Sequence, residues 1–264
     1  MLDLRQVALV HHRGRPNQVV ALRDVTLTVP KGQFVTIVGS NGAGKSSLVK
    51  VVSGAAAPTH GTVWIGGREV TRQPDYRRAR YVARVFDNPE AGTVADLSIE
   101  ESIALAMRRG QRRLLRKAVT AKRRATMREA LAVLGLGLEN RLGDRVGLLS
   151  AGQRQSLTMV MATLSDPEVL LLDEHVAALD PATQQRVVEL TVDIVGRTGC
   201  TALMVTHNMK HALDLGDRLL VLSRGRILAD FSAADKARMS VDDLVHSISG
   251  AGDLVADRSL LAER

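Results

Sequence analysis

Residues 39–46 form a glycine-rich stretch that ends in a lysine and a serine, Gly-Ser-Asn-Gly-Ala-Gly-Lys-Ser. The apolar run Phe34–Val38 precedes this stretch, and residues Ser46–Ser53 carry apolar side chains at helical spacing. A phosphate-binding P-loop requires this strand–loop–helix order, because its glycines let backbone N–H groups curl around a polyphosphate at a helix N-terminus. The stretch predicts a nucleotide site formed by Gly39, Ser40, Asn41, Gly42, Ala43, Gly44, Lys45, Ser46 and Ser47.

Two residues of this loop and two acids further along the chain have predicted chemical roles. We expect Lys45 to bridge the β- and γ-phosphates of ATP and Ser46 to ligate Mg²⁺. The apolar run Val169–Leu172 ends in Asp173 and Glu174. Asp173 would hold Mg²⁺ through water, and Glu174 would polarise the water that attacks the γ-phosphate. Alone, such an ending is equally typical of a solvated strand end, and the P-loop favours the functional interpretation.

Short apolar runs around a helical segment indicate the fold class. Leu170–Asp173 and Ala202–Val205 have the composition of buried parallel strands, and Pro181–Thr198 between them has apolar residues at helical spacing. This strand–helix–strand order predicts an α/β fold with a mostly parallel sheet. Further strands are predicted at Leu4–Val10, Val25–Val29, Phe34–Val38, Thr62–Ile65 and Tyr81–Phe86, and on both sides of the Arg224-Gly225 turn.

The middle of the chain, from about residue 88 to residue 165, is predicted to be mainly helical. Ser98-Ile-Glu-Glu101 has the spacing of a capping box, which starts a helix. A second helix is expected over Thr120–Leu134, and a last one near the end of the chain over Val241–Ser247.

Leu149-Ser-Ala-Gly-Gln153 precedes another segment with an apolar helical face. A serine cap followed by a small, glycine-containing turn exposes backbone N–H groups that can bind an anion. The spacing alone predicts only a well-capped helix at this position.

Five motifs occur in a fixed order along the chain: Gly39–Ser46, Leu149–Gln153, Leu170–Glu174, Ala178-Leu-Asp180 and Thr206-His207. With them, over roughly residues 2–247, the chain resembles the ATP-binding subunits of ABC transporters, for which Leu-Ser-x-Gly-Gln is diagnostic. The resemblance implies an ATPase domain over residues 1–232, with a P-loop NTPase core, an N-terminal antiparallel β subdomain and a helical subdomain inserted at about 88–165. Residues 233–264 would form a short C-terminal helix and tail.

The resemblance also implies a head-to-tail homodimer that binds ATP and Mg²⁺. Each ATP would lie between the P-loop of one subunit and Ser150, Gly152 and Gln153 of the other. Asp180 would lie at the dimer seam. His207 would contact the γ-phosphate and link it to Glu174, so that the catalytic residues would be Glu174, His207 and Lys45.

Three positions depart from the family pattern. Ala151 replaces a usual glycine, and its methyl group could crowd the phosphate. His11, or alternatively His12, stands where an aromatic residue usually stacks on adenine. Asp87 replaces a glutamine that contacts Mg²⁺ and senses the membrane partner; it could bind Mg²⁺ more strongly or fail to bridge to the attacking water. We expect active but slowed hydrolysis.

Within the family, four short segments narrow the resemblance. They are Gly92-Thr93, Arg108-Arg109-Gly110, Asp173-Glu-His175 and Thr206-His-Asn-Met209. They resemble a group of importer ATPases associated with aromatic amino acids such as tryptophan and tyrosine. ATPase subunits do not bind the cargo, so these residues carry no direct chemical information about it.

The net charge of +8 is concentrated in residues 108–128. This basic arm contains no acidic residue and consists of Arg108, Arg109, Arg112, Arg113, Arg116, Lys117, Lys122, Arg123, Arg124 and Arg128. It is compatible with a solvated surface, with anionic lipid or the membrane permease, or with nucleic acid. The arm has no aromatic residue to stack bases, so we favour the permease and lipid and expect no nucleic acid.

Two function classes remain from the sequence. The first is a transport ATPase, peripheral on the cytoplasmic face of the inner or plasma membrane, that powers import through a separate permease. The second is a soluble ABC-type ATPase that acts on nucleic acid or the ribosome; an exporter ATPase is a further alternative. One P-loop and one Leu149–Gln153 motif favour transport, and the absence of a fused membrane span favours import, since no apolar run is long enough to cross a bilayer. The single cysteine, Cys200, excludes a disulfide framework and a cysteine-based zinc site.

Overall fold

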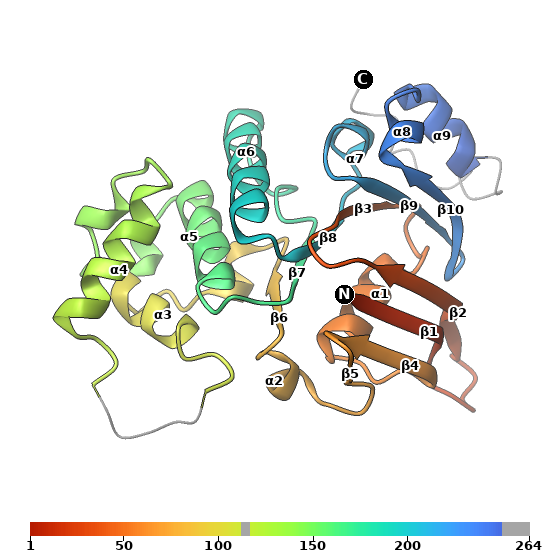
Figure 1. Cartoon of the computed structure of the whole chain (residues 1–264), viewed down its shortest axis with the longest axis horizontal. Helices are drawn as coiled ribbons and strands as arrows, with labels where there is room; N and C mark the ends of the chain where they lie inside the picture. Colours follow the sequence, from red (N-terminus) through yellow and green to blue (C-terminus); the bar gives the residue numbers. More distant parts are fainter. Residues whose placement is uncertain (112–116, 250–264) are drawn as a thin grey trace.

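The computed structural model describes residues 1–111 and 117–249 and contains two β-sheets with helices around them (Figure 1). The first sheet has the strand order β2-β1-β4-β5 and is antiparallel throughout. Its strands are β1 (Leu2–His11), β2 (Val19–Val29), β4 (His60–Ile65) and β5 (Arg68–Glu69). This sheet is the N-terminal antiparallel part of the fold class that the sequence predicts.

The second sheet has six strands in the order β10-β9-β3-β8-β7-β6. All neighbours in it are parallel except the β9–β10 hairpin. Its strands are β3 (Phe34–Val38), β6 (Val82–Val85), β7 (Val169–Asp173), β8 (Thr201–Val205), β9 (Arg218–Ser223) and β10 (Arg226–Ser232). Strands β3, β7 and β8 are buried along their whole length, as expected for central strands of a parallel sheet. The predicted α/β class is confirmed.

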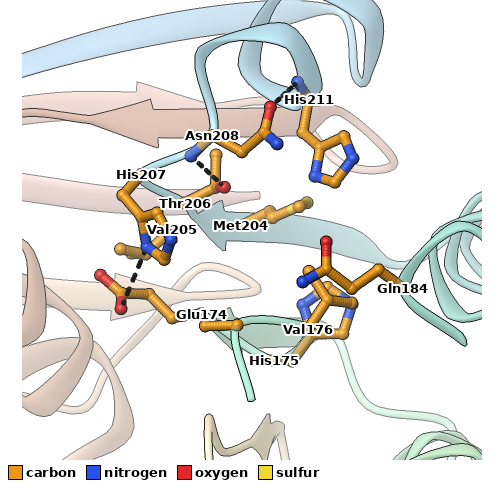
Figure 2. Close-up of a pocket in the computed structure, with 11 residues that line it drawn as sticks. Glu174, His175, Val176, Gln184, Met204, Val205, Thr206, His207, Asn208 and His211 are labelled. Carbon is orange, nitrogen blue, oxygen red and sulfur yellow. Dashed lines mark hydrogen bonds and ion pairs between the residues drawn. The ribbon is translucent and has the colours of Figure 1, made fainter. Parts of the chain in front are cut away.

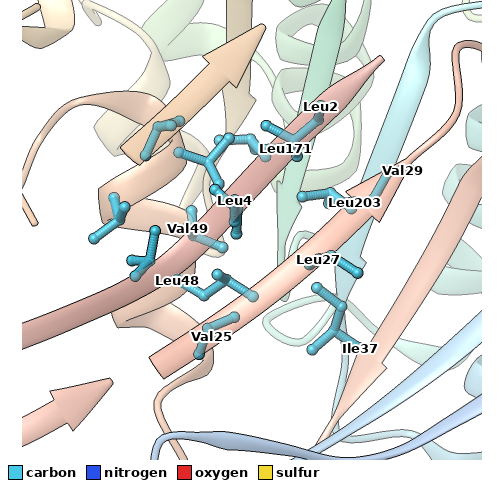
Figure 3. Close-up of a cluster of buried hydrophobic side chains, with 14 of the residues drawn as sticks. Leu2, Leu4, Val25, Leu27, Val29, Ile37, Leu48, Val49, Leu171 and Leu203 are labelled. Carbon is cyan, nitrogen blue, oxygen red and sulfur yellow. The ribbon is translucent and has the colours of Figure 1, made fainter. Parts of the chain in front are cut away.

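Helix α1 (Lys45–Ser53) lies between the two sheets and joins their cores (Figure 3). The shared cluster includes Leu2, Leu4, Val25, Leu27 and Val29 of the first sheet, Leu48 and Val49 of α1, and Ile37, Leu171 and Leu203 of the second sheet. Each fully buried aliphatic side chain of this kind contributes about 1.5–3 kcal/mol relative to an exposed one. The cluster therefore fixes α1, and with it the glycine-rich loop that precedes the helix.

Three helices lie between β6 and β7 in the sequence, at the end of the molecule opposite the first sheet (Figure 1). They are α3 (Ile99–Ala106), α4 (Ala121–Ala132) and α5 (Ala151–Thr163), with short 3-10 turns at Pro89–Gly92, Leu138–Asn140 and Val146–Leu148. Their apolar side chains form a separate cluster around Ile103, Met127, Leu131 and Leu157. Helix α5 also contributes Met159 and Ala162 to a cluster with β7 and β8, so it belongs to both cores. Arg112, Arg113 and Arg116 of the basic arm lie outside the described residues.

Five further helices complete the fold, and α6 among them packs on strands β7 and β8 of the second sheet. They are α2 (Asp75–Arg78), α6 (Pro181–Thr198), α7 (Met209–Asp214), α8 (Ala233–Lys236) and α9 (Val241–Ser249). Residues 250–264 of the predicted tail lie outside the described part of the chain. No helix within residues 1–111 and 117–249 combines the length and apolar content needed to cross a membrane.

Some elements differ from the sequence prediction. Strand β2 starts at Val19, six residues before the predicted start, because Asp24 has a φ of 53° and interrupts the alternation of buried and exposed residues. The short elements β5, α2, α7 and α8 have no counterpart in the prediction, since each contains too few residues to show a hydrophobic period.

Candidate functional site

Two glycines of the loop between β3 and α1 are required by close backbone packing. Gly39 has a φ of 153°, and a Cβ there would lie 2.2 Å from the carbonyl oxygen of Leu222 in β9. Gly44 has a φ of 106°, and a Cβ there would lie 2.7 Å from the carbonyl oxygen of Ala21 in β2. Any larger residue would push the loop away from both sheets, so these glycines set the position of the loop as well as its curvature.

The N-terminus of α1 is left open to a ligand. Its N-cap is Gly44, which provides no side chain to accept hydrogen bonds from the first N–H groups of the helix. Lys45 Nζ donates to the carbonyl oxygens of Gly39 at 2.6 Å and Ser40 at 3.1 Å. Ser46, the next residue, is exposed. The loop thus presents backbone donors, an ammonium group and a hydroxyl on one side, which is the donor set that a nucleoside polyphosphate and Mg²⁺ need.

Parallel strands β7 and β8 bring the predicted acids and the predicted histidine together. Asp173 is the last residue of β7 and pairs in register with Val205, the last residue of β8. Glu174 follows Asp173 directly, and His207 follows β8 after one residue. The Nδ1 atom of His207 lies 3.5 Å from Oε2 of Glu174, as Figure 2 shows.

Glu174 has a strained backbone and an ionised side chain. Its φ is 49°, in the left-handed region that a residue with a side chain rarely adopts, and its N–H donates to the carbonyl oxygen of Val205 at 3.0 Å. The hydrogen bond from His207 holds the pKa of the carboxyl below its ordinary value, although partial burial acts in the opposite direction. The carboxylate is therefore charged at neutral pH, as a residue that orients an attacking water must be.

Asp173 is engaged by an arginine that the sequence analysis did not identify. Arg84 of β6 places Nη2 2.6 Å from Oδ2 of Asp173, and both side chains are largely buried. The sheet order puts β6 beside β7, so this contact follows from the topology.

The oxygen ligands at the carboxyl ends of β3 and β7 are compatible with Mg²⁺. Within residues 1–111 and 117–249 no three His, Cys, Asp or Glu side chains are grouped closely enough to enclose a metal ion. Mg²⁺ bound together with a nucleotide needs only one or two protein oxygens, with phosphates and water completing its shell. The Ser46 hydroxyl and the Asp173 carboxylate are oxygens of this hard type.

Ser150 and Gln153 cap helix α5 reciprocally. The N–H of Gln153 donates to Ser150 Oγ at 3.3 Å, and the N–H of Ser150 donates to Gln153 Oε1 at 3.1 Å. Gly152 is required by packing, since a Cβ there would lie 2.3 Å from Cγ2 of Thr183 on α6. These residues line a shallow pocket with Ala182 and Thr183, and no P-loop residue lines that pocket.

Asp180 is the N-cap of α6. Its Oδ1 accepts a hydrogen bond from the N–H of Thr183 at 3.1 Å, and the hydrogen bonds that Thr183 donates to it hold the pKa of the Asp180 carboxyl below its ordinary value. Asp180 therefore has a structural role within one chain, whether or not it also meets a second subunit.

His11 and Asp87 are not tied to the other predicted residues. His11 is the partly exposed last residue of β1, opposite Val19. Asp87 follows β6 and is exposed. In the described part of the chain, neither side chain forms a hydrogen bond or an ion pair. Their predicted roles toward adenine and Mg²⁺ stay predictions.

Sequence reasoning missed a buried amide, Gln155, that connects three parts of the site. Its Nε2 donates to the carbonyl oxygens of Phe86 at 3.1 Å and His175 at 2.6 Å. It thereby ties α5 to the residue before Asp87 and to the residue after Glu174. Its side chain is fully buried next to the apolar face of α5. The sequence shows only a polar residue in a helix, because burial is not visible in it.

A second missed residue is His175, which is fully buried beside Glu174 in sequence. Figure 2 shows its ring by Gln184, on the side of the pocket away from the Glu174 carboxylate. Its Nε2 lies 2.9 Å from Thr191 Oγ1, whose hydroxyl donates to the Val187 carbonyl, so the network assigns the Nε2–H tautomer. Burial lowers the pKa of His175 to about 3.

Comparison with known proteins agrees with this arrangement. Residues 22–177 match the ABC transporter family. A tyrosine transport ATP-binding protein of Clostridioides difficile is 39% identical over 232 residues, which cover 88% of this chain and 91% of that protein. A sulfate/thiosulfate import ATP-binding protein of Mycobacterium tuberculosis is 34% identical over 238 residues, and there the match spans 90% of this chain and 64% of the relative.

A solved structure shows the same fold with nucleotide. It is a dimeric ATP-binding cassette in a post-hydrolysis state bound to ADP and Pi, with a TM-score of 0.74 and 26% identity over 88% of this chain and 99% of that one. The match of sequence and fold shows the family and its activity: the chain belongs to the ABC transporter family and is an ATP-binding ATPase of that family.

Proposed function

We propose that this ATPase powers import through a separate membrane permease, with Lys45, Glu174 and His207 as its catalytic residues. The observation that carries this proposal is that the parallel strands β3, β8 and β7 are neighbours and end on the same side of the sheet. They bring the P-loop, the Asp173–Glu174 pair and His207 to their carboxyl ends. In open parallel sheets, ligands bind outside the carboxyl ends of the strands.

Each side chain has a task that follows from its contacts. Lys45, which now donates to Gly39 and Ser40, turns its ammonium to the β- and γ-phosphates. Glu174 orients the attacking water, and His207 holds Glu174 and contacts the γ-phosphate. Ser46 and Asp173 hold Mg²⁺, which when bound supplies charge that offsets the phosphate oxygens.

We further propose a head-to-tail homodimer, in which Ser150, Gly152 and Gln153 of one subunit close the nucleotide site of the other. Their pocket contains no residue of the chain's own P-loop, which supports a ligand shared between two subunits. The similar cassette is dimeric.

Paired substitutions test the catalytic assignment. We expect Lys45→Ala to lose nucleotide affinity, measured with a fluorescent ATP analogue. We expect Glu174→Gln to keep that affinity and the ATP-dependent dimer while losing at least about 100-fold in turnover, the usual contribution of general base catalysis. Full turnover in Glu174→Gln would refute the role of Glu174, and an ATP-bound monomer by light scattering would refute the dimer.

The membrane partner is proposed to dock in a groove of about 1250 Å³ between the segment 73–81 and α3. Four arginines line this groove without any Asp or Glu, namely Arg77, Arg80, Arg108 and Arg109. Burial lowers the pKa of Arg109, and its Nη1 has no hydrogen-bond partner in the described part of the chain. Such a groove fits an acidic segment of the permease.

The subunit would then be peripheral on the cytoplasmic face of the membrane, with the basic arm near anionic lipid. Each basic residue near such a surface contributes on the order of 1 kcal/mol before screening by salt. We expect salt-sensitive binding to anionic liposomes that disappears when the ten basic residues of the arm are neutralised. Unchanged binding by the neutralised variant would rule out the lipid contact.

The cargo is proposed to be an aromatic amino acid such as tyrosine. The 39% identity to a tyrosine transport ATP-binding protein supports this proposal. The test is to copurify the chain from detergent extract, reconstitute the complex in proteoliposomes, and compare ATP-driven uptake of labelled tyrosine, methionine and sulfate. Recovery of nucleic acid instead of a polytopic membrane protein would refute the transport function.

A further inference from the structure

The Arg84 side chain lies between a carboxylate and an aromatic ring on β6, the edge strand of the second sheet. Its Nη2 lies 2.6 Å from Asp173 Oδ2, and its Cζ lies 4.5 Å from the centre of the Phe86 ring. Only 20% of the Arg84 side chain and 12% of the Asp173 side chain are exposed. Planar stacking combined with a short charge-assisted hydrogen bond is the arrangement that guanidinium favours over ammonium.

Few contacts hold the Arg84 guanidinium in this position. Its buried Nε has no hydrogen-bond partner among residues 1–111 and 117–249. Within the same residues, the Arg84 side chain contacts the Asp173 carboxylate and the Phe86 ring. Since no further acceptor holds Arg84 in place, the ion pair can open without breaking other hydrogen bonds.

Three charged groups of the site are engaged by other groups of the protein. Lys45 donates to backbone carbonyls, Glu174 contacts His207, and Asp173 is paired with Arg84. The backbone carbonyls that accept from Lys45 are neutral, and the partner of Glu174 is a histidine. Asp173 differs, because its partner is the full positive charge of Arg84, which would repel a divalent cation held by the same carboxylate.

We propose that Arg84 is a resident counter-cation of Asp173 that competes with Mg²⁺ for this carboxylate and thereby weakens the dependence of nucleotide binding on the metal. Arg84 is a positioning residue in this scheme, and it touches neither nucleotide nor metal. The proposal rests on the proposed role of Asp173 in holding Mg²⁺. Its physical basis is Coulomb repulsion in a partly buried site, where water screens charges less than in solution.

The opposite end of the same two strands provides a matched control. There Arg68 Nη1 lies 2.6 Å from Glu168 Oε1, and Arg68 Cζ lies 4.9 Å from the centre of the Tyr81 ring. Glu168 precedes β7 and Tyr81 precedes β6, so this pair repeats the arrangement of carboxylate, arginine and ring far from the carboxyl ends of the strands. Arg68 belongs to β5 of the first sheet and its side chain is 53% exposed, so this pair controls for the loss of an arginine–carboxylate pair away from the site.

The test measures how strongly Mg²⁺ tightens binding of a fluorescent ADP analogue, as the ratio of dissociation constants in EDTA and in Mg²⁺. We expect Arg84→Met to raise this ratio by about tenfold, the effect of a modest charge interaction. Arg84→Lys, which keeps the charge, should stay near the wild-type ratio, and Arg68→Met should match it. Thermal unfolding of each variant confirms that it is folded, and Arg84→Gln replaces Arg84→Met if the latter does not fold.

The outcomes separate this inference from the function on which it rests. If Asp173→Asn loses the Mg²⁺ effect while Arg84→Met leaves the ratio unchanged or lowers it, the competition is refuted and the metal role of Asp173 stands. If Asp173→Asn keeps the wild-type ratio, Asp173 does not hold the metal, and the role of Arg84 falls with it.

Discussion

The side-chain amide of Gln155 lies 2.6 Å from the carbonyl oxygen of His175 and so links helix α5 to the loop that carries Glu174. The same amide also reaches the carbonyl oxygen of Phe86, the residue before Asp87. One buried group therefore connects the helix that Ser150 caps with two loops at the nucleotide end of the sheet. Gln155 therefore ties the position of α5 to the backbone of both loops.

The first prediction concerns this amide. Gln155→Leu should lower the free energy of unfolding by about 1–3 kcal/mol, because two carbonyls lose a buried donor, and should also lower ATP turnover. Urea unfolding and phosphate release measure the two effects. The exposed Gln185 of α6, whose amide donates to Glu189 on the same helix, is the control, and its leucine variant should change stability by less than about 0.5 kcal/mol. Equal effects of both substitutions would contradict the prediction.

A pH dependence follows from His175. Its pKa is about 3 when folded and 6.5 when unfolded, so between these values the unfolded chain binds a proton that the folded chain does not. The free energy of unfolding should therefore fall as pH falls through this window, by up to about 1.4 kcal/mol per pH unit. His175→Gln should flatten this part of the profile, measured by urea unfolding at a series of pH values. His12→Gln, at an exposed position, should keep the wild-type slope; a wild-type slope in His175→Gln would show that other groups cause it.

Gly152 should be sensitive to a single methyl group. Gly152→Ala should destabilise the protein by about 1–3 kcal/mol, because its Cβ would lie 2.3 Å from the Thr183 methyl group. Thr183→Ser removes that methyl group and keeps the hydroxyl. The double variant should recover most of the lost stability, and a simple sum of the two single effects would exclude the clash as the cause.

Asp87 should limit the rate of hydrolysis. Because aspartate is shorter than glutamine and charged, Asp87→Gln should raise turnover roughly threefold, or about 0.7 kcal/mol in activation free energy. Phosphate release with and without the membrane partner measures this, and Asp96→Asn controls for loss of an exposed acid elsewhere. If turnover and its stimulation by the partner stay the same, the substitution at this position has no catalytic consequence.

Local patterns were sufficient to predict much of the fold. Helix α1 after the glycine-rich loop, the capping box at Ser98, the N-cap at Ser150, and the hairpin at Arg224-Gly225 all depend on residues close in sequence. The apolar runs of β7 and β8 likewise indicated buried strands. Each of these features is encoded within about ten neighbouring residues, where propensity and periodicity act.

The contacts that the sequence did not predict all depend on which elements become neighbours. Arg84 meets Asp173 because β6 lies beside β7, although 89 residues separate them. Gly152 meets Thr183 because α5 packs on α6. His175 was expected only as part of a short motif, and its burial follows from the layer of helices above β7 and β8.

The two hydrophobic clusters that share helix α5 have an evolutionary consequence. Residues around Met127 and Leu131 pack in their own cluster, and α5, together with Leu190 of α6, connects them to the core beneath the nucleotide end of the sheet. Substitutions on the outer face of α3 and α4 can therefore accumulate without disturbing the ATP-hydrolysing centre.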